Sequence, residues 1–93
     1  MTALIYSKTE CPFCHATKLY LQEHQIPYQE VVYDDDQQRQ QMYDELGLRD
    51  RQRTVPQIFI IDAAGHRTRI GGYTELRESG LIDQMAVDFN ADF

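Results

Sequence analysis

The chain has 93 residues, enough for one domain with a single modest core, and we expect residues 1–93 to form that domain. Its formal net charge of -6 at pH 7 argues against nucleic-acid binding, because binding to the phosphate backbone needs a basic face. No window approaches the roughly 18 continuous apolar residues of a membrane span, and residues 1–8 do not resemble a signal peptide, so we expect a cytoplasmic protein.

The pattern of apolar residues predicts alternating strands and helices. Leu4-Ile5-Tyr6 is typical of a buried strand, and Pro12 favours the start of a helix because proline is tolerated in the first helical turn. The predicted elements are, in chain order, a strand over 2–7, a helix over 12–25, a strand over 28–33, a helix over 37–46, a strand over 55–61, a short strand over 66–70, and a helix over 73–89 that is interrupted at Ser79-Gly80.

Three consecutive acidic residues, Asp34, Asp35 and Asp36, precede the second predicted helix. A metal-binding cluster is one interpretation. We prefer an N-terminal cap, because such side chains accept hydrogen bonds from free helical N–H groups and their charge interacts favourably with the helix dipole.

The order β-α-β-α-β-β-α predicts an α/β fold. A helix between the first two strands implies a crossover that leaves those strands parallel, whereas the turn at 62–65 implies an antiparallel hairpin. A mixed four-stranded sheet flanked by helices follows, which is a thioredoxin-like architecture.

Two cysteines lie where the first strand meets the first helix, in the motif Cys11-Pro12-Phe13-Cys14. The N–H groups and the dipole at a helix N-terminus stabilise a thiolate, and such placement lowers a cysteine pKa from about 8.5 into the range of roughly 3.5–7.5. Lys8 adds positive charge on the same side. We therefore expect Cys11 to be the exposed nucleophile and Cys14 to attack a mixed disulfide formed on Cys11.

Other interpretations of the cysteine pair stay open at this point. Cys14 followed by His15 matches the end of a haem-attachment pattern, which would require export. A zinc site would need two more ligands, and His15, His24 and His66 form no second ligand pair. A bound cluster and two buried structural cysteines complete the alternatives.

Three motifs in the right order resemble the glutaredoxin family: Cys11-Pro12-Phe13-Cys14, Thr54-Val55-Pro56, and the run from Gly71 to Glu75. The resemblance covers nearly the whole chain and is greatest to the dithiol class. It implies a thioredoxin fold and a glutathione-dependent thiol–disulfide oxidoreductase, active in electron transport and cell redox homeostasis.

The resemblance also implies a glutathione site and a cis peptide bond before Pro56. Val55 would pair with the glutathionyl backbone, the N–H groups at 73–75 and the Glu75 side chain would hold the γ-glutamyl end, and Lys8 would meet the glycyl carboxylate. The implied binding residues are Lys8, Phe13, Thr54, Val55, Pro56, Gly72, Tyr73, Thr74 and Glu75.

The sequence departs from the common family pattern at several positions. Phe13 replaces a more usual Tyr, and Glu75 replaces the shorter Asp. The loop 48–53 is longer than in the shortest members, and its three Arg are candidates for binding a carboxylate or a partner protein. Arg39 and Gln40 are candidate second contacts to the glycyl carboxylate.

The resemblance implies a monomer with glutathione as co-substrate and without a bound cofactor or metal. Disulfide-containing and glutathionylated proteins, ribonucleotide reductase among them, would be its partners. Two other functions remain: a thioredoxin-like reductant served by a flavoprotein reductase, and an iron–sulfur carrier that holds a cluster through Cys11 and glutathione.

Overall fold

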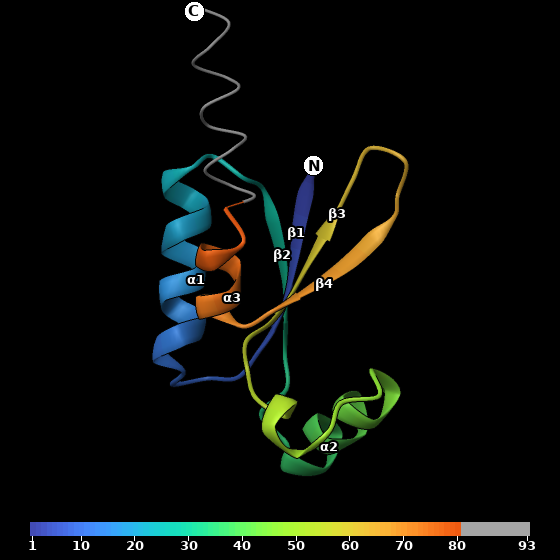
Figure 1. Cartoon of the computed structure of the whole chain (residues 1–93). Coiled ribbons are helices and arrows are strands. Elements are labelled where there is room, and N and C mark those ends of the chain that lie inside the picture. Colours follow the sequence, from blue (N-terminus) through green and yellow to red (C-terminus); the bar gives the residue numbers. More distant parts are fainter. Residues whose placement is uncertain (81–93) are drawn as a thin grey trace, which may run out of the picture.

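The structure is a computed structural model, and it describes residues 1–80 (Figure 1). Its elements are β1 (Thr2–Ser7), α1 (Pro12–Glu23), β2 (Tyr28–Val32), α2 (Asp36–Glu45), the 3-10 turn η1 (Asp50–Gln52), β3 (Gln57–Ile61), β4 (Arg67–Gly71) and α3 (Tyr73–Glu78). This order confirms the predicted one. The part of the last predicted helix beyond residue 80 lies outside the described residues.

The four strands form one sheet in the order β2-β1-β3-β4. β1 is parallel to β2, whereas the β1–β3 and β3–β4 pairs are antiparallel. In the centre of the sheet Ile5 stands opposite Glu30 of β2 on one side and Ile58 of β3 on the other. The predicted mixed sheet is therefore confirmed, with β2 and β4 at its edges.

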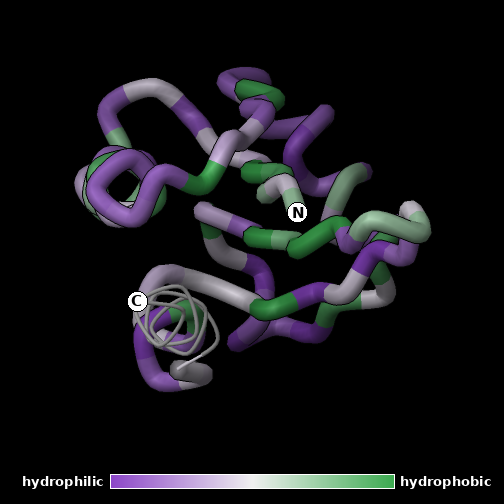
Figure 2. The backbone as a smooth tube through the Cα atoms, turned by 90° about the horizontal axis from the view of Figure 1, so that it is seen from above, coloured by the Kyte–Doolittle hydropathy of each residue, from purple (hydrophilic) through white to green (hydrophobic). Residues whose placement is uncertain are grey.

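The main core lies between the sheet and the two helices α1 and α3, which run side by side on the same side of the sheet (Figure 1). Seen from above, the most hydrophobic stretches gather in the strands (Figure 2). Strand residues that point toward the helices meet the buried face of α1 and one residue of α3. The buried residues of this cluster are Ala3, Ile5, Tyr20, Leu21, Ile58, Ile60 and Leu76.

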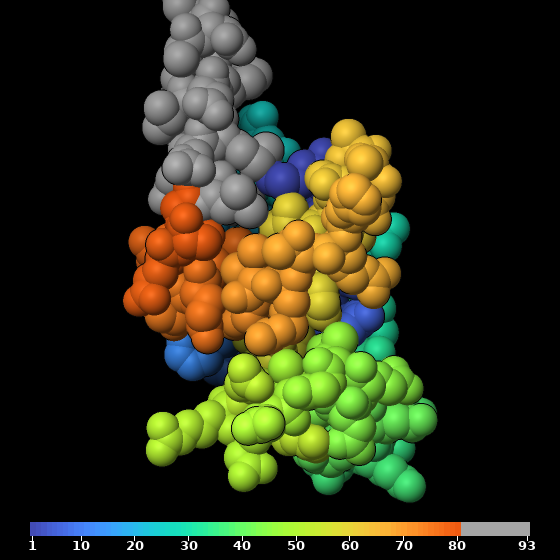
Figure 3. All heavy atoms as spheres, turned by 45° about the vertical axis from the view of Figure 1, so that its right-hand side comes forward, coloured from blue at the N-terminus to red at the C-terminus, as the bar shows by residue number. Residues whose placement is uncertain are grey.

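The helix α2 has a separate, smaller core. Met42, Tyr43 and Leu48 are buried together there, and Tyr6 and Tyr33 pack against them. Figure 1 shows α2 at the end of the sheet where β1 and β2 finish, and Figure 3 shows α2 and η1 together below β4 and α3. Among the helices of residues 1–80, α1 and α3 therefore cover the sheet face that carries the main core.

Some boundaries differ from the predicted ones. β3 begins at Gln57 rather than at Val55; Pro56, which precedes it, has no N–H to donate to a strand. The Val55–Pro56 peptide bond is cis, as the family resemblance implied. The predicted interruption at Ser79 marks the end of α3, where Ser79 is the C-cap. The loop 48–53 contains the turn η1, which the sequence did not predict.

Candidate active site

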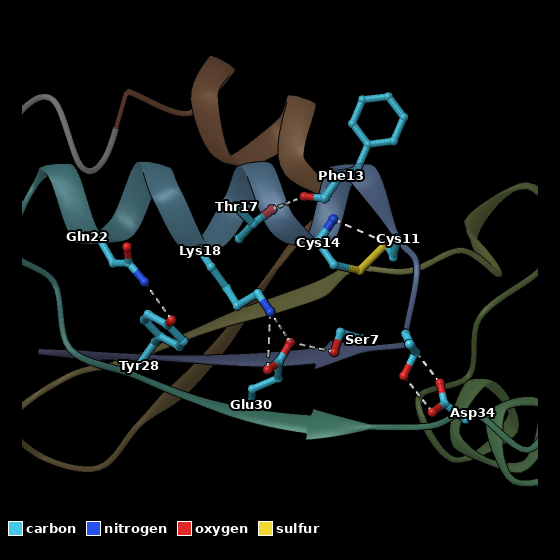
Figure 4. A network of polar contacts seen from close by, with 11 residues as sticks. Ser7, Cys11, Phe13, Cys14, Thr17, Lys18, Gln22, Tyr28, Glu30 and Asp34 are labelled. Carbon is cyan, nitrogen blue, oxygen red and sulfur yellow. Dashed lines mark hydrogen bonds and ion pairs between the residues drawn. A yellow bond between two sulfur atoms is a disulfide. The ribbon is translucent and has the colours of Figure 1, made fainter.

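Cys11 is the N-cap residue of α1, and Pro12 occupies the first helical turn (Figure 4). The Cys11 backbone is extended, and its Sγ accepts a hydrogen bond from the backbone N–H of Cys14 at 3.1 Å. This sulfur therefore lies against the free N–H groups of the helix, where negative charge is favoured.

Cys14 is one helical turn further along and only 2% exposed, whereas Cys11 is half-buried. The two cysteines form a disulfide, with their Cα atoms 5.2 Å apart. Only Cys11 of the pair offers its sulfur substantially to a substrate. The roles of attacking and resolving cysteine require such a difference in access, and they stay predictions.

A pocket of ≈ 260 Å³ lies beside this disulfide. The Cys11 Sγ is 3.8 Å from the carbonyl oxygen of Val55, so the cis-proline loop forms the wall next to the sulfur. All the residues that line the pocket belong to the set expected from the family resemblance: Phe13, Thr54, Val55, Pro56, Gly72, Tyr73, Thr74 and Glu75.

Gly71 and Gly72 let the Glu75 side chain fold back toward the pocket. Gly71 has φ +116, and a Cβ there would lie 3.3 Å from the Glu75 Cβ. A Cβ on Gly72 would lie 3.4 Å from the Glu75 Oε2 and 3.7 Å from the Pro56 carbonyl oxygen. The paired glycines therefore allow a carboxylate, a backbone carbonyl and the start of α3 to approach one another.

Aromatic side chains form one rim of the pocket. The Phe13 ring is 61% exposed, and its centroid lies 6.2 Å from that of Tyr73. Phe13 therefore offers an apolar surface beside Cys11, without the hydroxyl that a Tyr would supply.

The buried Gln57 holds the cis-proline loop in place, a role that sequence reasoning missed. Its Nε2 donates to the carbonyl oxygens of Gln52 at 2.9 Å and of Thr54 at 2.8 Å, and its Oε1 accepts from Arg69 at 3.2 Å. A polar residue in a strand whose neighbours are all apolar was the available signal.

Several predicted contact residues lie elsewhere. Lys8 lines a neighbouring pocket that also includes Cys11 and Cys14, so its contact with a glycyl carboxylate stays a prediction. Arg39 and Gln40 line neither this pocket nor the one beside Lys8. Arg39 donates a hydrogen bond to the carbonyl oxygen of Tyr33, and the side-chain oxygen of Gln40 accepts one from Arg53. Their contacts with the glycyl carboxylate also stay predictions.

The acidic residues at the start of α2 have different hydrogen-bond partners. Asp35 is the N-cap and accepts from the backbone N–H of Gln37 at 3.1 Å, which confirms a cap at this position. Asp34 instead accepts from the backbone N–H of Thr9 at 2.7 Å and from its hydroxyl at 2.6 Å. Asp34 therefore anchors the loop that leads into Cys11.

These two hydrogen bonds, the Thr9 hydroxyl first, hold the pKa of Asp34 below its ordinary 3.8. The ionised carboxylate then stabilises the fold above that value, and this stabilisation is lost as the pH falls through the lower pKa of the folded state. We expect Asp34→Ala to lower the thermal unfolding midpoint at about pH 7 and to differ progressively less from the parent protein below about pH 4. Unfolding scans across this range measure the difference, and a constant difference would contradict the anchor.

Within residues 1–80 no group of three or more His, Cys, Asp or Glu side chains is placed to hold a metal ion. Among the helices of the same part of the chain, none is both long enough and apolar enough to cross a membrane.

The known proteins whose sequences resemble this chain are described as glutaredoxins. The sequence model of the family described as Glutaredoxin matches residues 3–63. Glutaredoxin 3 of Escherichia coli K12 is 38% identical over 72 residues, which are 77% of each chain. Glutaredoxin-2 of Schizosaccharomyces pombe is 31% identical over 90% of this chain and 74% of its own.

Solved structures show the same likeness. The crystal structure of glutaredoxin 1 from Francisella tularensis, complexed with cacodylate, has a TM-score of 0.74 at 33% identity, covering 91% of this chain and 95% of its own. The buckwheat glutaredoxin–glutathione complex has a TM-score of 0.66 at 25% identity, covering 92% and 76%.

Proposed function

Because this chain belongs to the glutaredoxin family of thiol–disulfide oxidoreductases, we propose that it reduces protein disulfides and glutathionyl mixed disulfides with glutathione as reductant. The pocket beside Cys11 supports this proposal most strongly, because its walls combine backbone groups, an aromatic rim and a carboxylate. Glutathione is a tripeptide: its peptide backbone can pair with the backbone groups, its ammonium group can pair with the carboxylate, and its apolar parts can contact the aromatic rim.

In the proposed reaction the Cys11 thiolate attacks one sulfur of the substrate disulfide. The S–S bond breaks, the leaving thiolate takes a proton from solvent, and a mixed disulfide forms on Cys11. Cys14 then attacks the Cys11 sulfur and releases a protein substrate as its thiol. Two molecules of glutathione reduce the resulting Cys11–Cys14 disulfide and are oxidised to glutathione disulfide.

The glutathionyl group fits the pocket as follows. The N–H and C=O of Val55 pair with its backbone as a short strand would. The first-turn N–H groups of Thr74 and Glu75 face its α-carboxylate, and the Glu75 carboxylate faces its ammonium group. Lys8 meets the glycyl carboxylate, a contact that requires its side chain to reach across the disulfide.

The direct test is a coupled assay on one disulfide substrate with two reducing systems. Glutathione with glutathione reductase should sustain turnover, and thioredoxin reductase with NADPH should not. Turnover with thioredoxin reductase alone would instead favour a thioredoxin-like protein. We extend the proposal to a cytoplasmic monomer that acts on proteins such as ribonucleotide reductase, since the thiol pool of that compartment is kept reduced.

Glu75→Ala should weaken recognition of glutathionylated substrates. A hydrogen bond to a charged group is worth about 1.5–3 kcal/mol, or on the order of 10- to 100-fold in KM, and added salt should reduce the effect. KM for a glutathionylated peptide measures the change. Glu78→Ala removes the same charge from another exposed position of α3. Glu78 does not line the pocket, so this variant should leave KM unchanged. An equal loss on a small uncharged disulfide would show that Glu75 tunes the thiol instead.

A further inference from the structure

A second pocket, of ≈ 420 Å³, lies on the other side of the disulfide from the proposed glutathione site. It shares no lining residue with the ≈ 260 Å³ pocket, although Lys8, the proposed contact of the glycyl carboxylate, belongs to its lining. Both Cys11 and Cys14 line it, together with Lys18 of α1 and Glu30 of β2. The buried cysteine therefore has a polar environment that the glutathione site does not provide.

Glu30 is held in this second pocket by two partners (Figure 4). The hydroxyl of Ser7, which is completely buried at the end of β1, donates to its Oε2 at 2.7 Å. The Lys18 Nζ lies 3.1 Å from the same oxygen and 3.4 Å from Oε1. The Glu30 side chain is only 24% exposed, so its carboxylate has a defined position rather than a free one.

The helix brings this ion pair to Cys14. Cys14 and Lys18 are four residues apart in α1, so they lie on the same helical face, one turn from each other. Glu30 reaches Lys18 from the neighbouring strand, across the sheet face that α1 covers. A partly exposed ion pair adds only about 0–1 kcal/mol to stability, so stability alone gives little reason for this arrangement.

Resolution of a mixed disulfide poses a chemical problem at this place. Cys14 must lose its proton before or while it attacks, since the thiolate is the nucleophile. Burial removes water from a thiolate and so disfavours it, and solvent has poor access to the Cys14 side chain, which is 2% exposed. A nearby proton acceptor would speed this step.

We propose that Glu30 accepts the proton of Cys14, through water in the second pocket, when Cys14 resolves the mixed disulfide. The proposal rests on the function proposed above. The Cys14 thiol gives its proton to the Glu30 carboxylate as its sulfur bonds to the Cys11 sulfur. The bond from Cys11 to the substrate breaks, the substrate sulfur leaves with the electron pair and takes a proton from solvent, and Glu30 returns its proton to solvent.

The other charged groups of the pocket are placed differently. Lys8 and Glu10 belong to the loop before Cys11, and His15 lies near the start of α1. The positive charges of Lys8 and Lys18 favour a thiolate on either cysteine. Of the two carboxylates, Glu30 is the one that the hydroxyl of Ser7 and the ammonium group of Lys18 hold in position. Glu10 therefore provides a matched control in the same pocket.

The experiment mixes excess reduced protein with a fluorescent peptide disulfide dimer in a stopped-flow instrument. The first phase, release of one peptide thiol, reports the attack by Cys11; the second, release of the other thiol, reports resolution by Cys14. Glu30→Gln should slow the second phase at least about tenfold at pH 7 and leave the first unchanged; the effect is smaller than the roughly 100-fold or more of a typical general base because water intervenes. Glu10→Gln should change neither phase.

The pH profile separates proton transfer from a structural role. The deficit of Glu30→Gln should shrink as the pH rises, because Cys14 then ionises without an acceptor. Ser7→Ala, which frees the Glu30 side chain, should slow the second phase by a smaller factor. A second phase that is unchanged in Glu30→Gln, a loss shared by Glu10→Gln, or a deficit that is constant with pH would overturn the proposal.

Failure of the underlying function would look different. In the Cys14→Ser background no second phase exists, so adding Glu30→Gln should leave removal of glutathione from a peptide at the rate of the single variant. If Cys14→Ser still showed the second phase, or if glutathione did not sustain turnover of the parent protein, the proposed function would be wrong. Glu30→Gln would not be the cause of either result.

Discussion

Cys11→Ser is expected to abolish all thiol–disulfide exchange. The hydroxyl that replaces the thiol is not ionised at neutral pH, and the other sulfur of the pair is only 2% exposed. Turnover of glutathionylated peptide and of a protein disulfide, each followed with glutathione and its reductase, should both fall to background. Circular dichroism checks that the fold is retained, since Cys11 is an N-cap residue and Ser serves that position equally well.

Cys14→Ser is expected to separate the two reactions. Removal of glutathione from a peptide needs Cys11 and a second glutathione, so much of that activity should remain. Reduction of a protein disulfide requires resolution by Cys14 and should be lost. Equal inactivity of both single variants toward a glutathionylated peptide would mean that the attacking and resolving roles are assigned wrongly.

Leu21→Ala is expected to cause a large loss of stability. Leu21 is completely buried between α1 and the sheet, and truncating such a side chain removes apolar burial and leaves a cavity. The free energy of unfolding should fall by about 2–5 kcal/mol, measured by urea denaturation of the oxidised protein.

Leu19→Ala makes the same chemical change two residues away on the same helix. Leu19 is 45% exposed, so the variant should lose far less stability, on the order of 0.5 kcal/mol. If the two variants lost equal stability, the face of α1 that packs on the sheet would be assigned incorrectly.

Much of the architecture could be predicted because it follows from local patterns. Apolar runs mark the strands, and the length of the connections decides which strands are parallel. Pro12 marks the first turn of α1, and the Ser79-Gly80 break marks the end of α3. The start of β3 at Gln57 was not predicted, because a run of apolar residues does not show which of them pair with the neighbouring strand.

The candidate site, too, could be predicted in part. The pocket walls lie on three motifs far apart in the chain, and their family pattern was sufficient to name every lining residue. The resemblance did not indicate the contacts of Gln57, Asp34 or Glu30, because the partner of a polar side chain is decided by the folded backbone, whether that partner is near in the sequence or far away. Gln57 holds the cis-proline loop, Asp34 reaches back 25 residues to Thr9, and Glu30 meets Ser7 across 23 residues.

The sequence by itself determined the order of elements, the position of Cys11 at a helix N-terminus and the family. These follow from residue types at short spacing and from motifs that need no coordinates. Only the tertiary structure decided that Lys8 faces the second pocket, that Asp34 anchors the loop before Cys11, and that Glu30 stands on the side of Cys14. A hydrogen bond or an ion pair depends on where the sheet and helices bring side chains together in space, and a linear pattern does not record that distance.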